Sequence, residues 1–244
     1  AVETYSSDSF DELQGVAEAS GVTASAVMFL NTRAEIGNLN ERSGCTALAI
    51  DGRPYEKRMG IVGQNWDNDP ELDRFLLVLT RRPSDKPSFI TLTTPGIAAY
   101  IGLNEAGLAL CMNALPGDCS ATGVPWYFSV RGVLESRSID EARTAIVTSE
   151  RARSGNLILM TSEGAVDFEV HTNVIKELKP DSEGRLVHTN HCLHSDLEHV
   201  NDEQRELLYG QTFDRLERAN RLFANIQGAI SVGDIMQMLS DHAG

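Results

Sequence analysis

The sequence has few cysteines and no long hydrophobic run, and each deficit excludes a class of protein. Four cysteines among 244 residues, with no CxxC pair, do not make a disulfide scaffold, so Cys45, Cys111, Cys119 and Cys192 are interpreted as thiols. The longest apolar runs, such as Phe75–Leu79, are far shorter than the ~20 residues of a membrane span. No basic-then-apolar leader opens the chain. We therefore expect a soluble protein with no membrane partner.

Positive charge is also scarce. The formal net charge is −14 and the isoelectric point is near 4.8, so the average field of the protein repels phosphate backbones. Nucleic acid is therefore not expected as a partner. Hydrophobic residues make up 41% and charged residues 23%, which is ordinary for a globular chain of one large domain.

The first part of the chain predicts two short helices followed by a polar loop. Apolar residues recur at helical spacing over 7–19, Gly21 ends that helix, and a second helix begins near Thr23 or Ser25. The polar stretch 37–44 predicts an exposed loop. This loop is the best candidate for a boundary in the chain.

From Cys45 onward, short apolar runs between turn residues predict a strand-rich body. Two helices, one from Pro125 and one at 139–148, interrupt the strands, and a helical stretch over 201–238 with an apolar stripe including Phe213 ends the chain. The order fits two stacked antiparallel sheets with helical layers outside, an α+β fold of four-layer αββα type. The predicted strands are 46–50, 59–64, 74–80, 89–93, 98–103, 108–112, 156–161, 165–170, 174–178 and 185–189.

A glycine precedes a cysteine where the loop becomes a strand, at Gly44-Cys45. A thiol can attack the preceding peptide carbonyl, take the acyl group onto sulfur and leave a thioester that water hydrolyses. Gly44 tolerates the strained backbone that this attack requires. The product would begin with Cys45, whose α-amine, with a typical pKa of about 7.7–8.0, can accept the thiol proton. By itself the dipeptide favours the simpler interpretation, a small buried cysteine at a strand start.

Polar residues close the strand that should pair with the one opening at Cys45. The Asp51-Gly52 turn folds one strand back on the other, which brings Asn65 and Asp67 close to the strand start. A carboxylate there can hold an α-amine. The alternative is a polar strand end with a core tryptophan.

Taken in order, these segments resemble the acyl-coenzyme A:6-aminopenicillanic acid acyltransferase family, whose members are autoproteolytic cysteine enzymes related to penicillin V and bile-salt hydrolases. The resemblance implies the fold of the N-terminal-nucleophile hydrolases. It spans about residues 43–195, and a segment before the cut, Leu30–Glu35, is also similar. The matching motifs are Gly44-Cys45-Thr46, Gly63-Gln64-Asn65-Trp66-Asp67, Asn104-Glu105-Ala106-Gly107-Leu108, Met112-Asn113-Ala114-Leu115, Gly123-Val124-Pro125 and Val187-His188-Thr189-Asn190-His191-Cys192.

The resemblance implies a role for each matching residue. Cys45 is then the nucleophile and, with Gly44, the self-cleavage site, while Asp67 binds the α-amine. Asn190 donates to the oxyanion, and Asn113 is a second such donor; neutral amides suit this task because they do not compete for the proton. The remaining implied residues are Ser154, which matches a serine linked to processing, and Gln64 and Asn65, which are assigned to substrate binding.

The chain departs from the family at two places. Bile-salt hydrolase relatives carry arginine where this chain has Gln64, which favours the acyltransferase branch. The family's later Ser-Ile-Cys-Arg element, whose arginine helps complete the site, has no match before the chain stops at Gly244, and the family's N-terminal segment has none ahead of Ala1. We therefore expect a sequence trimmed at both ends and a site without that arginine.

Several metal-type ligands crowd one short stretch, 188–199. Alternate residues of an extended segment point to opposite faces, and no HExxH or CxxC motif is present, so we predict no metal site there. His188 is instead expected beside Asn190, behind the site or in the core. The residues concerned are His188, His191, Cys192, His194 and His199.

These observations predict a precursor in two parts. Residues 1–44 become a small subunit, residues 45–244 form the large catalytic one, and the fragments stay associated. The enzyme is expected to cleave or transfer acyl groups at amide or thioester bonds, with a small-molecule acyl donor and either an amine or water as acceptor. No cofactor is expected, though acyl-coenzyme A is a possible co-substrate. The location is expected to be intracellular, cytoplasmic or peroxisomal.

Two other functions stay open. One is a C–N amide hydrolase of the penicillin V, bile-salt or N-acyl amino acid type. The other is a non-catalytic scaffold that retains the fold. Hydrolase and transferase differ only in whether water or an amine captures the Cys45 thioester, and the residues above serve both.

Overall fold

The computed structural model describes residues 1–36, 44–52, 60–120, 122–203 and 211–242. Its strands form two antiparallel sheets, one of order β10-β1-β2 and one of order β3-β4-β5-β6-β7-β8-β9. The strands of the smaller sheet are β1 (Cys45–Ile50), β2 (Ile61–Trp66) and β10 (Arg185–His188). Those of the larger sheet are β3 (Leu77–Arg81), β4 (Phe89–Thr93), β5 (Gly102–Asn104), β6 (Ala109–Ala114), β7 (Gly155–Thr161), β8 (Gly164–Val170) and β9 (Ile175–Leu178).

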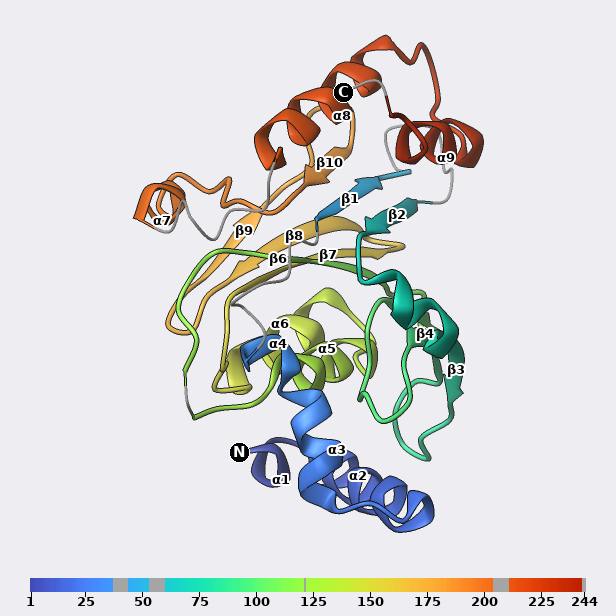
Figure 1. The fold of residues 1–244 in the computed structure, drawn as a ribbon. Coiled ribbons are helices and arrows are strands. Elements are labelled where there is room, and N and C mark those ends of the chain that lie inside the picture. Colours follow the sequence, from blue (N-terminus) through green and yellow to red (C-terminus); the bar gives the residue numbers. More distant parts are fainter. Residues whose placement is uncertain (37–43, 53–59, 121, 204–210, 243–244) are drawn as a thin grey trace.

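Helices lie outside both sheets (Figure 1). On the outer side of the smaller sheet are α8 (Thr212–Asn225) and α9 (Val232–Leu239), with α7 (Glu198–Glu203) at its edge. Under the larger sheet are α5 (Trp126–Leu134) and α6 (Ile139–Thr148), followed by the N-terminal helices. Those are α1 (Val2–Tyr5), α2 (Ser7–Ser20), α3 (Ala24–Asn31) and α4 (Arg33–Ile36).

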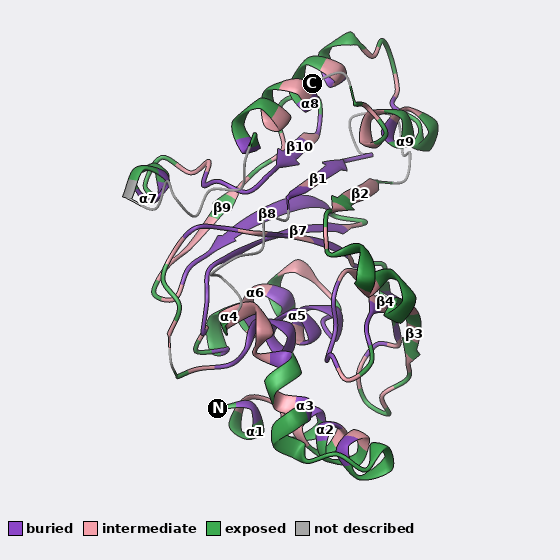
Figure 2. Ribbon diagram, viewed as in Figure 1, coloured by how far each residue is buried: buried purple, intermediate pink, exposed green. Residues whose placement is uncertain are grey.

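Three apolar cores separate the four layers. One joins the larger sheet to α5, α6 and the N-terminal helices, and includes Phe128 and Phe168. A second lies between the sheets, where Ala47 faces Cys111, and a third joins β1 to Phe223 of α8. Buried residues follow the central strands, whereas exposed ones follow the outer helices (Figure 2). The predicted four-layer αββα sandwich is therefore confirmed.

Local sequence signals explain most helix ends. The side chain of Ser6 accepts a hydrogen bond from Ser9 N at the start of α2, and Gly21, with φ of 69°, ends that helix in the left-handed conformation. Thr23 caps α3 in the same way, and a reciprocal capping box between Ser231 and Asp234 begins α9. The helices predicted at 7–19 and from Thr23 are thus confirmed. None of the described helices is long and apolar enough to cross a lipid bilayer.

Some element predictions were wrong in their limits. The strand expected at 74–80 begins only at Leu77, because Pro70–Phe75 is a 3-10 helix that Asp69 caps. The strand expected at 98–103 is reduced to Gly102–Asn104, since Tyr100 N binds the side chain of Thr91 on β4 rather than a backbone carbonyl of that strand. The remaining predicted strands agree with β1, β2, β4 and β6 to β10 within one or two residues.

The C-terminal helical stretch is also not continuous. It divides into α7, α8 and α9, and the left-handed turn at Gly228, with φ of 80°, lies between the last two. Phe213, predicted on the apolar stripe, is 50% exposed and stacks on His191 instead. Residues 37–43, 53–59 and 204–210, which include most of the predicted loop and the turn after Gly52, lie outside the described residues.

Candidate active site

The peptide bond between Gly44 and Cys45 lies at the start of β1, held by the strand beside it. The β1–β2 register places Cys45 opposite Trp66, so the next residue, Asp67, lies beside Gly44. Asp67 N donates to the Gly44 carbonyl oxygen at 2.9 Å. A Cβ atom on Gly44 would lie only 2.8 Å from Asp67 Oδ2. The predicted approach of Asp67 to the strand start is therefore present in the fold.

Asn190 reaches the same peptide from the other side of β1. It follows β10, which pairs with β1 through Ala47 and His188. Its Oδ1 accepts the Cys45 N–H at 2.7 Å, and its Nδ2 donates to the Ala114 carbonyl at the end of β6 at 3.0 Å. The side-chain amide of Asn190 thus joins the smaller sheet to the larger one at the Gly44–Cys45 peptide.

Arg215, on the first turn of α8, completes the group. Its Nη1 donates to the Cys45 carbonyl and, at 3.0 Å, to Thr46 Oγ1, while its Nη2 donates to Asn190 Oδ1 at 2.9 Å. The family's Ser-Ile-Cys-Arg element has no match in this chain. Arg215 comes from a different segment, which the sequence motifs did not single out.

A clue to Arg215 is present in the sequence. Thr212, Ala219 and Phe223 form the buried face of α8, and Arg215 falls on that face between them. Arginine on the buried face of a helix is uncommon unless it is paired. Its partners, Cys45 and Asn190, are 170 and 25 residues away along the chain. No motif spacing links positions so far apart.

The Cys45 thiol is almost completely buried. Burial raises its pKa to about 11, against smaller lowering contributions from the Asn190 amide, the Ala114 backbone N–H and the Arg215 cation. At neutral pH the sulfur is therefore a protonated thiol while the chain is intact. Thiolate formation at this site therefore needs a base that accepts the thiol proton.

A second set of contacts fixes the segment that carries Asn190. Thr212 Oγ1 accepts the Asn190 N–H at 2.8 Å and also contacts His191 Nδ1 at 2.9 Å. Thr212 lies one helical turn before Arg215. The hydroxyl of Thr212 thus ties the backbone of Asn190 to the helix that supplies the cation.

His188 and Glu169 form a fully buried pair behind Asn190. His188 Nε2 contacts Glu169 Oε1 at 2.9 Å, and His188 Nδ1 lies 2.9 Å from the Thr189 carbonyl, which can only accept. Glu169 also accepts the backbone N–H groups of Leu193 and His194. The pKa of His188 is raised by Asp167 and Glu169 despite its burial, and that of Glu169 is lowered by His188 despite its burial. This pair anchors the turn 188–194 at three points.

Asp167, on β8 near this pair, has a raised pKa, whereas the pKa of Glu169 is lowered. Full burial, with the nearby Glu169 adding to it, raises the pKa of Asp167 to about 7. Its Oδ1 accepts a hydrogen bond from Asn156 Nδ2, while Asp167 Oδ2 and Asn156 Oδ1 are both buried with no partner among the described residues. A proton on Oδ2 makes that oxygen a hydrogen-bond donor, which a carboxylate oxygen cannot be. We therefore assign Asp167 as a neutral acid below about pH 7.

Three other predicted site residues make no hydrogen bond of their own to the Cys45 peptide among those of the described residues. Asn113 Nδ2 donates to the His188 carbonyl at 3.4 Å, and its buried Oδ1 has no partner among the described residues. Gln64 bridges the two sheets through the Met112 backbone, with bonds of 2.5 and 2.9 Å. Asn65 pairs with Thr46 on the helix-facing side of the sheet and donates to Leu239 O at 2.6 Å.

Ser154 has surroundings of its own. It is buried, its Oγ lies 3.1 Å from His171 Nδ1, and His171 Nε2 lies 3.5 Å from Cys192 Sγ. A Cβ atom on Gly117 would lie 2.2 Å from Ser154 Oγ, so the backbone at Gly117 packs tightly on the Ser154 hydroxyl. These contacts link Ser154 to the turn after β10 and not to the Gly44–Cys45 peptide.

The four-layer sandwich thus has a buried cysteine at the start of its central strand β1. A sequence model of the acyl-coenzyme A:6-aminopenicillanic acid acyl-transferase family matches residues 55–244. The chain belongs to this family. The matched residues begin after Cys45, so the match does not include the Gly44–Cys45 peptide.

One curated relative is the 40 kDa form of acyl-coenzyme A:6-aminopenicillanic-acid-acyltransferase from Emericella nidulans. It is 32% identical over 188 residues, which make up 75% of this chain and 52% of that protein. The chain thus spans about half the length of the curated relative that it matches.

Two solved structures are similar at low identity. Penicillin V acylase from Agrobacterium tumefaciens is 12% identical with a TM-score of 0.43, covering 80% of this chain and 63% of that one. A variant of conjugated bile acid hydrolase from Clostridium perfringens is 11% identical with a TM-score of 0.45, covering 83% of this chain and 71% of that one.

Proposed function

We propose that this chain is the precursor of a cysteine N-terminal-nucleophile enzyme that cuts its own Gly44–Cys45 bond and then transfers acyl groups through Cys45. The observation that carries the proposal is the bonding of that one peptide. Its carbonyl accepts from Asp67 N at 2.9 Å, and its N–H donates to Asn190 Oδ1 at 2.7 Å. Residues 1–44 would be the small subunit and residues 45–244 the large one.

Self-cleavage would begin with attack of Cys45 Sγ on the Gly44 carbonyl carbon. The Asp67 backbone N–H already points at the oxygen on which negative charge develops, as an oxyanion donor must. The thiol proton passes to the Cys45 nitrogen as the C–N bond breaks, leaving a thioester and an amine. Water then releases the Gly44 carboxylate and the free Cys45 thiol.

Turnover would use the group created by the cut. The new α-amine takes the place of the peptide N–H against Asn190 Oδ1, within reach of the Asp67 carboxylate, and it can accept the thiol proton. Asn190, with Asn113 as a second amide, is proposed to donate to the substrate oxyanion. Arg215 would favour the Cys45 thiolate through its charge, since it already contacts the Cys45 carbonyl.

The substrate class follows from this chemistry and from the family. A Cys45 thioester can form from an amide or a thioester donor and can pass to an amine or to water. The curated relative is named for acyl-coenzyme A and 6-aminopenicillanic acid. By that similarity we propose an acyl-coenzyme A or amide donor and a small amine acceptor, with hydrolysis as the reaction when the amine is absent.

The test is the mass of the purified protein. Wild-type protein should separate under denaturing conditions into the fragments 1–44 and 45–244, and Cys45→Ala should stay as one chain and be inactive toward every acyl donor. Cys111→Ala is the matched control, because Cys111 is also a buried thiol but lies on β6. Cleavage or turnover that survives Cys45→Ala would refute the proposal.

A second measurement separates transfer from hydrolysis and from a scaffold role. Wild-type protein is given an acyl donor with increasing concentrations of an amine, and both products are quantified. Transfer predicts amide product at the expense of free acid. An intact wild-type chain that neither forms an acyl-enzyme nor reacts with iodoacetamide would favour the scaffold.

A further inference from the structure

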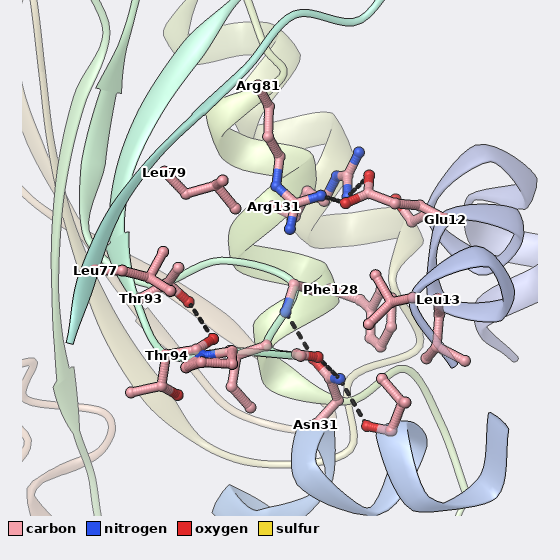
Figure 3. A pocket seen from close by; sticks show the side chains of 17 residues that line it. Glu12, Leu13, Asn31, Leu77, Leu79, Arg81, Thr93, Thr94, Phe128 and Arg131 are labelled. Carbon is pink, nitrogen blue, oxygen red and sulfur yellow. Dashed lines mark hydrogen bonds and ion pairs between the residues drawn. The ribbon is translucent and has the colours of Figure 1, made fainter. Parts of the chain in front are cut away.

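A cavity of about 310 Å³ lies between the N-terminal helices and the body of the protein. Its walls come from α2 and α3 on one side, and from β3, the segment 93–98 and α5 on the other (Figure 3). An apolar cavity of about 150 Å³ is already enough to hold a benzene molecule. This cavity therefore has room for a larger molecule, and none of its lining residues belongs to the group around Cys45.

Most of the cavity wall consists of apolar side chains. Leu77 and Leu79 of β3 stand on one side of the cavity, opposite Leu13 and Phe128 (Figure 3). Both leucines of the strand are only partly buried, so this wall can be reached from solvent. The apolar wall residues are Leu13, Val16, Val27, Leu77, Leu79 and Phe128.

The charged residues at one end of the cavity are already paired. Arg131 Nη1 donates to Glu12 at 2.5 Å and Arg131 Nε to Glu135 at 2.7 Å, while Arg81 also pairs with Glu12. The cluster to which they belong sets Arg81, Arg131 and Lys86 against Asp8, Glu12 and Glu135. Its cations and carboxylates balance, so this end of the cavity selects neither an anion nor a cation.

Two further polar groups of the lining are unavailable to a ligand. The amide of Asn31 is used within the protein, since Nδ2 donates to Gly96 O at 2.7 Å and Oδ1 accepts from Ala98 N at 2.8 Å. Arg81 Nε has no partner among the described residues, but it is buried and presents no surface to the cavity. A charged ligand would therefore lose hydration without gaining a free ionic partner, which is costly.

We propose that this cavity binds an uncharged apolar molecule somewhat larger than benzene. The ligand would lie between Leu13 of α2 and Leu79 of β3. Because α2 and α3 precede the Gly44–Cys45 peptide and the other walls follow it, the ligand would contact the chain on both sides of the proposed cut. Binding would stabilise the docked N-terminal helices, since the cavity exists only in the folded protein. The proposal does not depend on Cys45 or on self-cleavage.

The test uses isothermal titration calorimetry of the whole protein with three ligands that share a phenylpropyl skeleton. n-Propylbenzene should bind at least about tenfold more tightly than 3-phenylpropanoate or 3-phenylpropylammonium, because only the uncharged ligand enters without desolvating a charge. Its binding enthalpy should become more negative as the temperature rises, as burial of apolar surface requires. No binding of n-propylbenzene, or an ion that binds as tightly, would overturn the proposal.

Two variants on one strand locate the site. Leu79→Trp should fill the cavity and weaken n-propylbenzene by about tenfold or more. Val78→Trp is the matched control, because Val78 is 71% exposed on the opposite face of β3 and should bind as wild type does. If Leu79→Trp does not fold, Val16→Trp on the opposite wall takes its place. Unchanged binding in the filled variant would place the ligand elsewhere and refute the assignment.

Discussion

The Gly44 carbonyl and the Cys45 N–H are each held by one hydrogen bond, the first from Asp67 and the second from Asn190. Three of the four residues lie in or beside strands of one sheet, so the bonds follow from strand register. The fourth, Asn190, depends on the buried turn after β10. At the scale of single residues, these two hydrogen bonds fix the position of the Gly44–Cys45 peptide, on which the proposed chemistry depends.

Replacing Gly44 should slow the cut without unfolding the protein. A Cβ atom there would lie 2.8 Å from Asp67 Oδ2 and 3.2 Å from Arg215 Nη2, both at the ends of flexible side chains. We expect Gly44→Ala to fold and to cleave roughly ten- to a hundredfold more slowly, since small misplacement is costly in catalysis. Gly15→Ala is the control, because a Cβ on Gly15 meets nothing within 4 Å. Equal cleavage rates would contradict the close approach.

Self-cleavage should accelerate with pH. Burial raises the pKa of the Cys45 thiol to about 11, so below that value the thiolate fraction rises about tenfold per pH unit. Freshly refolded intact chain, sampled on denaturing gels between pH 7 and 9.5, should therefore show a log rate that rises with a slope near one. A rate independent of pH over this range would mean that thiolate formation does not limit the cut.

At the scale of elements, the inner faces of β8 and β10 carry charge where a sandwich core is normally apolar. His188 and Glu169 are both completely buried and paired. Breaking such a pair usually costs about 3–5 kcal/mol, because the remaining ion is left unpaired. The pair sits behind Asn190 and bonds the turn that carries it. We interpret it as the anchor that fixes Asn190 at the Cys45 peptide.

Asp167→Asn should stabilise the protein at high pH. The pKa of Asp167 is about 7 in the folded protein, above its value in the unfolded chain. The protonated carboxyl therefore contributes stability at low pH, and this contribution is lost as the pH rises from about 4 to 7. An asparagine amide replaces the acid O–H and does not titrate. Urea unfolding should show the variant gaining on wild type by a few kcal/mol over this range, at about 1.4 kcal/mol per pH unit.

The control for this variant is Asp140→Asn, at an exposed position on α6. Its difference from wild type should vary little between pH 4 and 8. A stability difference for Asp167→Asn that does not change with pH would show that Asp167 is already ionised throughout.

At the scale of the whole molecule, residues 1–36 are built into the fold. Asn31 bonds the segment at Gly96 and Ala98, and Tyr5 Oη donates to the Ala145 carbonyl at 3.2 Å. Val2, Leu13 and Val27 belong to the main apolar core. If the proposed cut after Gly44 occurs, burial would therefore keep the N-terminal segment docked without the covalent link.

The two fragments should co-elute in size-exclusion chromatography after self-cleavage. Asn31→Ala removes the acceptor of Ala98 N and the donor to Gly96 O, so it should release fragment 1–44 at lower urea than wild type. Asn220→Ala, an exposed asparagine on α8, is the control. Separate elution of the wild-type fragments without denaturant would contradict the docking.

The sequence by itself determined the layered α+β fold, because strand runs, helix periodicity and caps are local signals that survive in most elements. It also determined the meeting of Cys45 with Asp67, since one hairpin register brings both to the same strand end. The strand errors at 74–80 and 98–103 came from local hydrogen bonds by Asp69 and Thr91 that hydrophobicity does not encode.

Only the tertiary structure decided the rest of the site. Arg215 reaches Cys45 because α8 packs across the outer face of the smaller sheet, and no spacing over 170 residues records that packing. Gln64 and Asn65, neighbours in the sequence, make contacts on opposite sides of the smaller sheet, because successive residues of a strand face opposite sides. The raised pKa values of Cys45 and Asp167 likewise arise from burial between two sheets, a property of the assembled layers and not of any segment.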